Sequence, residues 1–257
     1  YDIVPFIGVS AQVLDGTDPT LVHVTPATVL TSGNTYGLSG SGARDLVGNV
    51  SIDAGIFEFN YSVPAVADFR DVVINEIMAD PSPVVGLPEV EFIEIVNTTT
   101  DKTFDMNGWT ITDGSSTGTL NSLSLHPGDH LILTAIGNPP LFAAFGAVQG
   151  LSPFPSLNND GDALVLKDGT GTTIDAVTYK LAWYQDILKA AGGWTLEQID
   201  PTSPCSGAAN WRASNDGAGG TPGAQNSIFA IVPDDAAPAL ASVQVSGPST
   251  IVLVFNE

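Results

Sequence analysis

Basic side chains are scarce in this chain. Its 257 residues include 7 Lys and Arg against 28 Asp and Glu, so its formal net charge is −21 at pH 7. Proteins that bind nucleic acid rely on Lys and Arg to contact phosphates, and anionic membrane surfaces repel a chain this acidic. The charge balance therefore excludes nucleic-acid binding and leaves calcium, cationic partners and neutral glycans open.

The chain also has few thiols, no long apolar run and no clear catalytic motif. Cys205 is the single cysteine, so an internal disulfide, a CxxC redox pair and a zinc site with several thiolates are excluded. No window of about 20 apolar residues predicts a membrane span, so we expect no membrane insertion. The one GxSxG match, Gly114–Gly118, begins at the hairpin signal Asp113-Gly114 rather than between a strand and a helix, so it does not predict a nucleophile elbow. No GxGxxG or GxxxxGK[ST] run occurs, so a hydrolase and a nucleotide-binding protein are both unsupported.

Glycine, proline and β-branched residues are plentiful. The 27 Gly and 18 Pro divide the chain into short pieces and disfavour long helices. Val72–Met78 and Glu91–Asn97 are the clearest strand candidates, with the turn residues Asp80–Pro83 between them. Similar short runs recur at regular spacing along the chain. This pattern predicts an all-β fold, most simply a β-sandwich.

Each of these two strands carries an acid in an apolar row. With a period of two, the shared faces are Val72, Ile74, Glu76 and Met78 on one strand, and Val90, Phe92, Glu94 and Val96 on the other. A buried acid needs a partner, and seven basic residues cannot serve 28 acids. Such acids accept hydrogen bonds from backbone N–H groups, raise their pKa or bind a metal.

Calcium is the one metal that these acids suggest. Glu76, Glu94 and Asp80 are candidate ligands, because hard oxygen ligands without histidine or thiolate suit Ca²⁺. The alternative, which we favour, is that the acids bond to backbone groups in a strand corner. No other cofactor is indicated.

Aromatic and histidine side chains supply the remaining candidates. Trp183 and Tyr184 lie in a predicted loop, where exposed rings stack on sugars or anchor a partner. The alternative, again favoured, is a local lid on the sandwich. His126 and His130 flank a turn, and because no third ligand is evident we interpret them as turn residues rather than as a metal site.

A family resemblance emerges from six runs in order. They are VINEIMADP, EFIEIVN, MNGWTITD, LHPGDHLILT, LNNDGDALVLKDGTGTTIDAVTY and GGWTLEQID. Together they resemble the lamin-tail domain, an Ig-like fold that is widespread in secreted bacterial proteins. The resemblance covers nearly all of Val72–Asn226 and implies an Ig-like sandwich over residues 70–228. In the bacterial version the domain is commonly an accessory unit of large extracellular proteins, some of them hydrolases.

The flanking sequences resemble pieces of bacterial Ig-like modules from surface-layer proteins. Leu30–Tyr36 and Asp45–Asn49 resemble the later part of such a module, which implies a partial module over residues 1–66. Residues 234–257 resemble the first strands of another copy. Because the first piece lacks opening strands and the last supplies them, we predict strand complementation between residues 243–255 and 1–66. The abrupt ends suggest an excerpt of a longer polypeptide.

These observations converge on a non-catalytic role. We expect a structural and interaction segment of a large secreted or cell-surface bacterial protein, which spaces or presents domains or adheres to a surface. Its expected partners are other modules of the same polypeptide or cell-surface polymers. The alternative is a calcium-dependent or carbohydrate-binding accessory module of an extracellular hydrolase. Fold resemblance alone does not decide between them.

Overall fold

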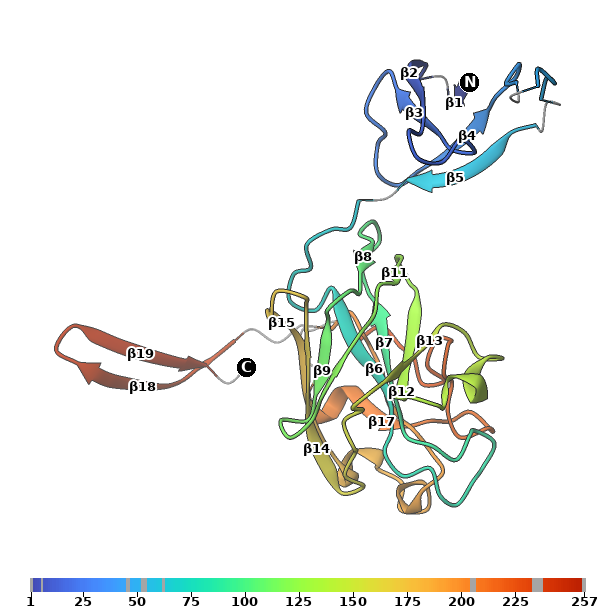
Figure 1. Cartoon of the computed structure of the whole chain (residues 1–257). Helices are drawn as coiled ribbons and strands as arrows, with labels where there is room; N and C mark the ends of the chain where they lie inside the picture. The colour runs from blue at the N-terminus through green and yellow to red at the C-terminus, as the bar shows by residue number, and fades with distance from the viewer. Residues whose placement is uncertain are drawn as a thin grey trace. The chain divides into compact units, whose positions relative to one another are not determined.

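The computed structural model describes residues 2–5, 7–44, 47–51, 55–61, 63–203, 207–232 and 238–255. They form two compact units, Tyr1–Ala65 and Val66–Glu257 (Figure 1). Strands and short 3₁₀ turns are the regular structure of the described residues, which confirms the predicted all-β class. No helix among them is long and apolar enough to cross a membrane. Cys205 lies outside the described residues.

Two main sheets build the second unit. One has six strands in the order β13-β12-β7-β6-β16-β17, and the other has four in the order β10-β9-β14-β15. The first comprises β6 (Val72–Met78), β7 (Phe92–Asn97), β12 (His130–Ala135), β13 (Val148–Leu151), β16 (Leu196–Gln198) and β17 (Trp211–Ala213). The second comprises β9 (Thr110–Thr112), β10 (Thr117–Thr119), β14 (Gly161–Lys167) and β15 (Thr173–Lys180). The predicted Ig-like β-sandwich is thus confirmed.

Shorter elements complete this unit. A two-stranded ribbon pairs β8 (Phe104–Asp105) with β11 (Ser124–Leu125). Four 3₁₀ turns lie in the connections: η1 (Pro139–Phe142), η2 (Leu181–Tyr184), η3 (Lys189–Ala191) and η4 (Ala208–Asn210). Because the connections are long and partly ordered in this way, they can fold back over the sheets.

The central strands β6 and β7 are buried along their whole length. A sheet with one solvated face would show alternating burial, so both faces of these strands must be covered. One covered face holds a core of Met78, Leu87, Phe92, Ile132 and Phe142, of which Leu87 and Phe142 come from connections between strands. We call this covered face of the six-stranded sheet the outer face.

A β-bulge decides which β6 residues reach the outer face. Ile74 pairs with Ile95 and Glu76 pairs with Glu94, so the register shifts at Asn75. Because Glu94 and Ile95 are neighbours in β7, they point to opposite faces, and their partners Glu76 and Ile74 do so as well. The predicted row that joins Ile74 to Glu76 is therefore wrong, since the extra residue of the bulge breaks the period of two.

The first unit is a smaller set of strands. A three-stranded sheet has the order β1-β4-β5, from β1 (Asp2–Val4), β4 (Asn34–Ser39) and β5 (Phe57–Tyr61), and β2 (Val9–Leu14) pairs with β3 (Val22–Pro26). Tyr36 is buried, and its hydroxyl oxygen accepts a hydrogen bond from the Thr31 N–H. Tyr36 of the Leu30–Tyr36 run thus anchors the segment around Thr31, which lies just before β4.

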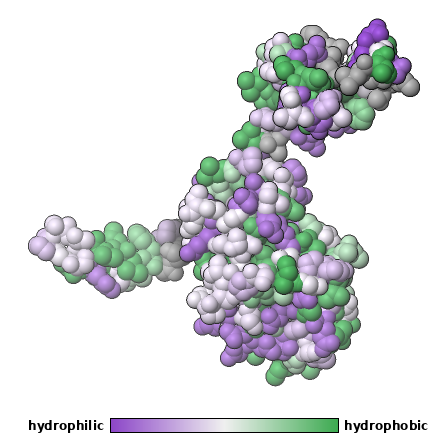
Figure 2. All heavy atoms as spheres, viewed as in Figure 1, coloured by the Kyte–Doolittle hydropathy of each residue, from purple (hydrophilic) through white to green (hydrophobic). Residues whose placement is uncertain are grey.

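Residues 238–255 contribute a hairpin. Its strands β18 (Leu240–Gly247) and β19 (Thr250–Phe255) pair with each other in antiparallel fashion. Apolar side chains of both strands are exposed, and Figure 2 shows them as an apolar surface along the hairpin. The complementation of residues 1–66 by residues 243–255 stays a prediction.

A buried ion pair joins the two sheets of the sandwich. Arg70, just before β6, donates from Nη1 to Asp175 Oδ1 of β15 at 2.9 Å, and the two side chains are 9% and 2% exposed. Asp175 Oδ2 also accepts from the Ile74 N–H at 2.8 Å. Burial raises the pKa of Asp175 although Arg70 opposes the shift. One carboxylate thus connects the four-stranded sheet to the start of β6.

We expect Arg70→Ala to destabilise the protein by about 3–5 kcal/mol, because it leaves Asp175 buried without its cation. Urea denaturation measures the change. Asp68→Ala is the matched control, since it removes a carboxylate that is 81% exposed from its ion pair with Lys102. Its effect should be far smaller. Equal effects of the two substitutions would contradict the structural role of the buried pair.

Candidate functional site

Three buried glutamates form a row across the six-stranded sheet. Glu94 of β7 pairs with Glu76 of β6, and Glu76 pairs with Glu197 of β16. Direct cross-strand neighbours point to the same face, so all three carboxylates lie on the outer face. Each residue is fully buried. We call Glu94, Glu76 and Glu197 the glutamate row.

A later stretch of chain covers the row. Residues 219–228, here called the covering segment, donate backbone N–H groups to each carboxylate in turn. Thr221 N donates to Glu76 Oε1 at 2.8 Å, Gly223 N donates to Glu94 Oε2, and Ile228 N donates to Glu197 Oε2 at 3.2 Å. The backbone role that we favoured from sequence is the one that the geometry supports.

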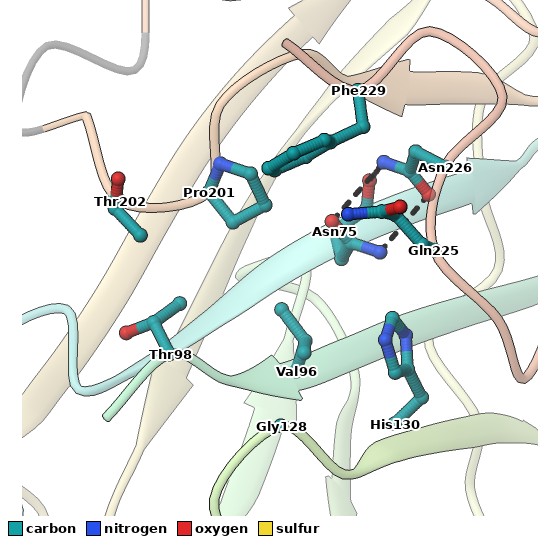
Figure 3. A pocket seen from close by; sticks show the side chains of 10 residues that line it. All are labelled: Asn75, Val96, Thr98, Gly128, His130, Pro201, Thr202, Gln225, Asn226 and Phe229. Carbon is teal, nitrogen blue, oxygen red and sulfur yellow. Dashed lines mark hydrogen bonds between the residues drawn. The ribbon is translucent and has the colours of Figure 1, made fainter. Parts of the chain in front are cut away.

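Amide side chains lock the same segment to the bulge. Asn75, the extra residue of β6, donates from Nδ2 to Glu94 Oε1 at 2.9 Å and to Asn226 Oδ1 at 3.0 Å. Asn226 Nδ2 donates to the carbonyl oxygens of Asn75 and Gln198. Figure 3 shows the bonds between Asn75 and Asn226. The bulge therefore has a structural role: it places the Asn75 amide where it binds both the glutamate row and the covering segment.

Glycine is required where the segment passes closest to its neighbours. Gly223 has φ +81°, and a Cβ there would lie 1.9 Å from the Phe145 carbonyl oxygen. At Gly220 a Cβ would lie 2.6 Å from Glu76 Oε1. Larger residues would push the segment away from the carboxylates. Close approach to the glutamate row thus explains Gly220, and close approach to the Phe145 backbone explains Gly223.

The electrostatics of the row centre on Glu76. Burial, followed by the charge of Glu94, raises the pKa of Glu76 well above its ordinary value, and Glu197 adds to the rise. Hydrogen bonds from Thr195 and Thr221 oppose it. Oε2 of Glu76 is buried without a hydrogen-bond partner in the described structure. Burial and the neighbouring carboxylates therefore favour the protonated form of the middle carboxyl of the row.

One basic side chain in the described ranges lies within ion-pair distance of the row. His130 of β12 faces Glu94 Oε1 through Nδ1 at 2.8 Å. The sequence interpretation of His130 as a turn residue missed this pairing. His126, by contrast, does lie at the turn, where its N–H donates to Asp129 Oδ2. The period of two in β12 could have predicted the pairing, because it places His130 and Ile132 on the same face as Glu94.

The structure does not bring the three predicted calcium ligands together in a metal cluster. Asp80 follows β6 and caps its own turn, where its Oδ1 accepts from Ser82 N at 3.4 Å. No group of three or more His, Cys, Asp or Glu side chains in the described residues is arranged to hold a metal ion. Glu197 was missed from sequence because β16 has only three residues, too few to show a strand pattern.

The predicted aromatic pair is largely enclosed. Tyr184 is buried, and its hydroxyl donates to the Trp194 carbonyl oxygen at 3.1 Å. Trp183 is half-buried, with its ring 6.3 Å from that of Trp211 of β17. These contacts support the interpretation of Trp183 and Tyr184 as a lid on the sandwich, not as free rings that bind a ligand.

The described geometry agrees with one comparison to known proteins. The sequence model of the lamin tail domain family matches residues 65–181, which run from shortly before β6 to the end of β15. Lamin tail domains are Ig-like, as is the sandwich seen here. The match ends before β16 and the covering segment. No curated protein matches the chain.

We expect Glu76→Gln to be at least as stable as the wild type at pH 7. A carboxyl whose pKa rises on folding binds more protons in the folded state, so its contribution to stability falls as pH increases above 4.5. A glutamine side chain does not titrate, so the variant does not lose stability in this way as pH rises. Its carbonyl oxygen can still accept the hydrogen bonds from Thr195 and Thr221. The advantage should shrink toward pH 4.5 in urea titrations. A stability difference between variant and wild type that stays constant from pH 4.5 to pH 7 would contradict the raised pKa of Glu76.

Glu94→Gln is the matched control. Both Glu94 oxygens already accept hydrogen bonds, so an amide NH₂ would face the Gly223 N–H or the Asn75 amide. Leaving a buried donor unsatisfied costs about 1–3 kcal/mol, and we expect that loss at pH 7.

The calcium site remains a prediction, which a thermal melt tests. Because the carboxylates of the row already accept internal donors, we expect midpoints in excess chelator and in millimolar calcium to agree within about 1 °C. An ion bound at a hundred times its dissociation constant would instead add about 2.7 kcal/mol and raise the midpoint by several degrees. Such a rise would assign the row to calcium.

Proposed function

We propose that this chain is a non-catalytic structural and interaction segment of a large secreted or cell-surface bacterial protein. In this proposal the central sandwich spaces or presents other domains, or adheres to a surface. One observation carries it: the buried acids of the glutamate row, the strongest candidates for chemistry, are used to hold the protein's own covering segment. The match to the lamin tail domain family supports a module of this type.

The flanking strands support the same proposal. The first unit and the β18–β19 hairpin lie on either side of the sandwich in sequence, and their sequences resemble bacterial Ig-like modules. Several β modules in series are typical of proteins that extend from a surface. The expected partners are then neighbouring modules of the same polypeptide or polymers of the cell surface.

A second candidate function is a carbohydrate-binding accessory module of an extracellular hydrolase. A cleft on the outer face favours it, because an exposed phenylalanine and several polar side chains meet there. The chain would remain non-catalytic in this role as well, with the chemistry supplied by another domain.

Protease treatment of intact source cells tests the location. We expect an antibody against this chain to detect fragments released from intact cells or chain in the culture medium, with a cytoplasmic marker protein retained as control. A chain that is protected in intact cells and degraded only after lysis would contradict the proposal.

A panel of glycosidase, esterase and nuclease substrates tests the absence of catalysis. We expect no turnover by the wild type, and the same background for Glu76→Gln and Glu94→Gln. Turnover that the wild type shows and either variant loses would place a catalytic carboxylate in the glutamate row.

A further inference from the structure

A cleft of about 340 Å³ lies on the outer face beside the glutamate row, on the side of Asn75 and Val96 (Figure 3). Val96 and Asn75, from the two central strands, line it on the sheet side. Phe229 and Pro201, from two later connections, line it on the other. Its volume lies in the range of sites for small molecules, about 300–1,000 Å³.

The aromatic wall of this cleft is fixed by backbone hydrogen bonds. Phe229 is 40% exposed although it is a large apolar residue. Its N–H donates to the Asn226 carbonyl oxygen at 3.0 Å, and the next N–H, of Ala230, donates to Ile199 at 3.0 Å. The Pro201 carbonyl oxygen accepts from Arg70. A wall held in this way is present before any ligand arrives, which lowers the entropic cost of binding.

The polar groups at the edges of the cleft include both donors and acceptors. His130 uses Nδ1 for Glu94, so its other ring nitrogen remains for the cleft. Gln225 is exposed and offers an amide N–H₂ and a carbonyl oxygen. Thr98 donates its hydroxyl proton to the Arg70 carbonyl oxygen, which leaves its oxygen free to accept. Hydroxyl groups of a ligand can meet such a mixed set, since each donates and accepts.

The charge of the cleft favours a neutral ligand. Lys and Arg are absent from its described lining. Two buried carboxylates adjoin that lining, and both already accept hydrogen bonds: Glu94 from the Asn75 amide and the Gly223 N–H, and Asp200 from Thr202 and the Val232 N–H. An anion would find no cation there and would meet a chain of net charge −21. A cation would find no unoccupied carboxylate.

We propose that this cleft binds a neutral sugar ring. The apolar face of the ring packs against Phe229, and its hydroxyl groups bond to Gln225 and His130. The site differs from the predicted Trp183–Tyr184 pair, whose rings are enclosed. This inference rests on the proposed function, because sugar binding is one way in which a surface segment adheres to cell-surface polymers.

Amide-shift NMR on the full chain tests the inference with neutral sugars as probes. The panel is methyl glucoside, methyl mannoside, methyl galactoside and N-acetylglucosamine, each titrated to 50 mM. We expect at least one probe to shift the signals of Gln225, Phe229 and His130 in a saturable way, with a dissociation constant of about 1–10 mM. Phe229→Ala and Gln225→Ala should each weaken that binding at least tenfold.

Two controls keep the result interpretable. Phe57→Ala removes an exposed phenylalanine from β5 of the first unit and should leave sugar binding unchanged. Unchanged thermal midpoints for Phe229→Ala and Gln225→Ala show that the sandwich remains folded. Gln225→Ala is the safer variant, because the Gln225 side chain is exposed.

Two outcomes would overturn the inference: no saturable shift with any probe, or binding that survives both cleft variants. Neither of them touches the proposed function, which fails only if intact cells protect the chain or if the chain shows turnover. The two failures are therefore distinguishable.

Discussion

Hydrogen bonds from the backbone of the covering segment to the glutamate row are the interaction on which the sandwich depends. Three carboxylates lie on one buried face, and burial without partners would be costly for each. The chain is too poor in Lys and Arg to supply cations. Backbone N–H groups from Thr221, Gly223 and Ile228 take their place. This requirement fixes the path of the segment and the glycines along it.

The same constraint explains how charge is distributed inside the fold. One of the scarce cations, Arg70, is used at Asp175, where the two sheets meet. Among the described residues, His130 is the basic side chain within ion-pair distance of the glutamate row, and the charge of Glu94, together with burial, raises the pKa of Glu76. Phe229, the residue that follows the covering segment, lies partly exposed in the cleft beside the row. Fold stability and the proposed sugar site therefore share one set of contacts.

The sequence predicts much of this arrangement and fails at identifiable places. Both central strands, their acids and the all-β class follow from local patterns of branched residues and turns. The face of Ile74 does not, because a bulge depends on pairing with another strand. Glu197 and the pairing of His130 with Glu94 depend on contacts between distant segments. Tyr184 lies in a connection as expected, and its burial there supports the favoured interpretation as part of a lid on the sandwich.

Hydrogen exchange at the amides of Thr221, Gly223 and Ile228 tests the central claim most directly. If the carboxylates hold the covering segment as an integral part of the sandwich, these amides should exchange with a free energy close to that of global unfolding. The backbone amides of β6 and β7 provide the reference in the same experiment. Exchange of all three as fast as that of exposed loop amides, while β6 and β7 stay protected, would contradict the account.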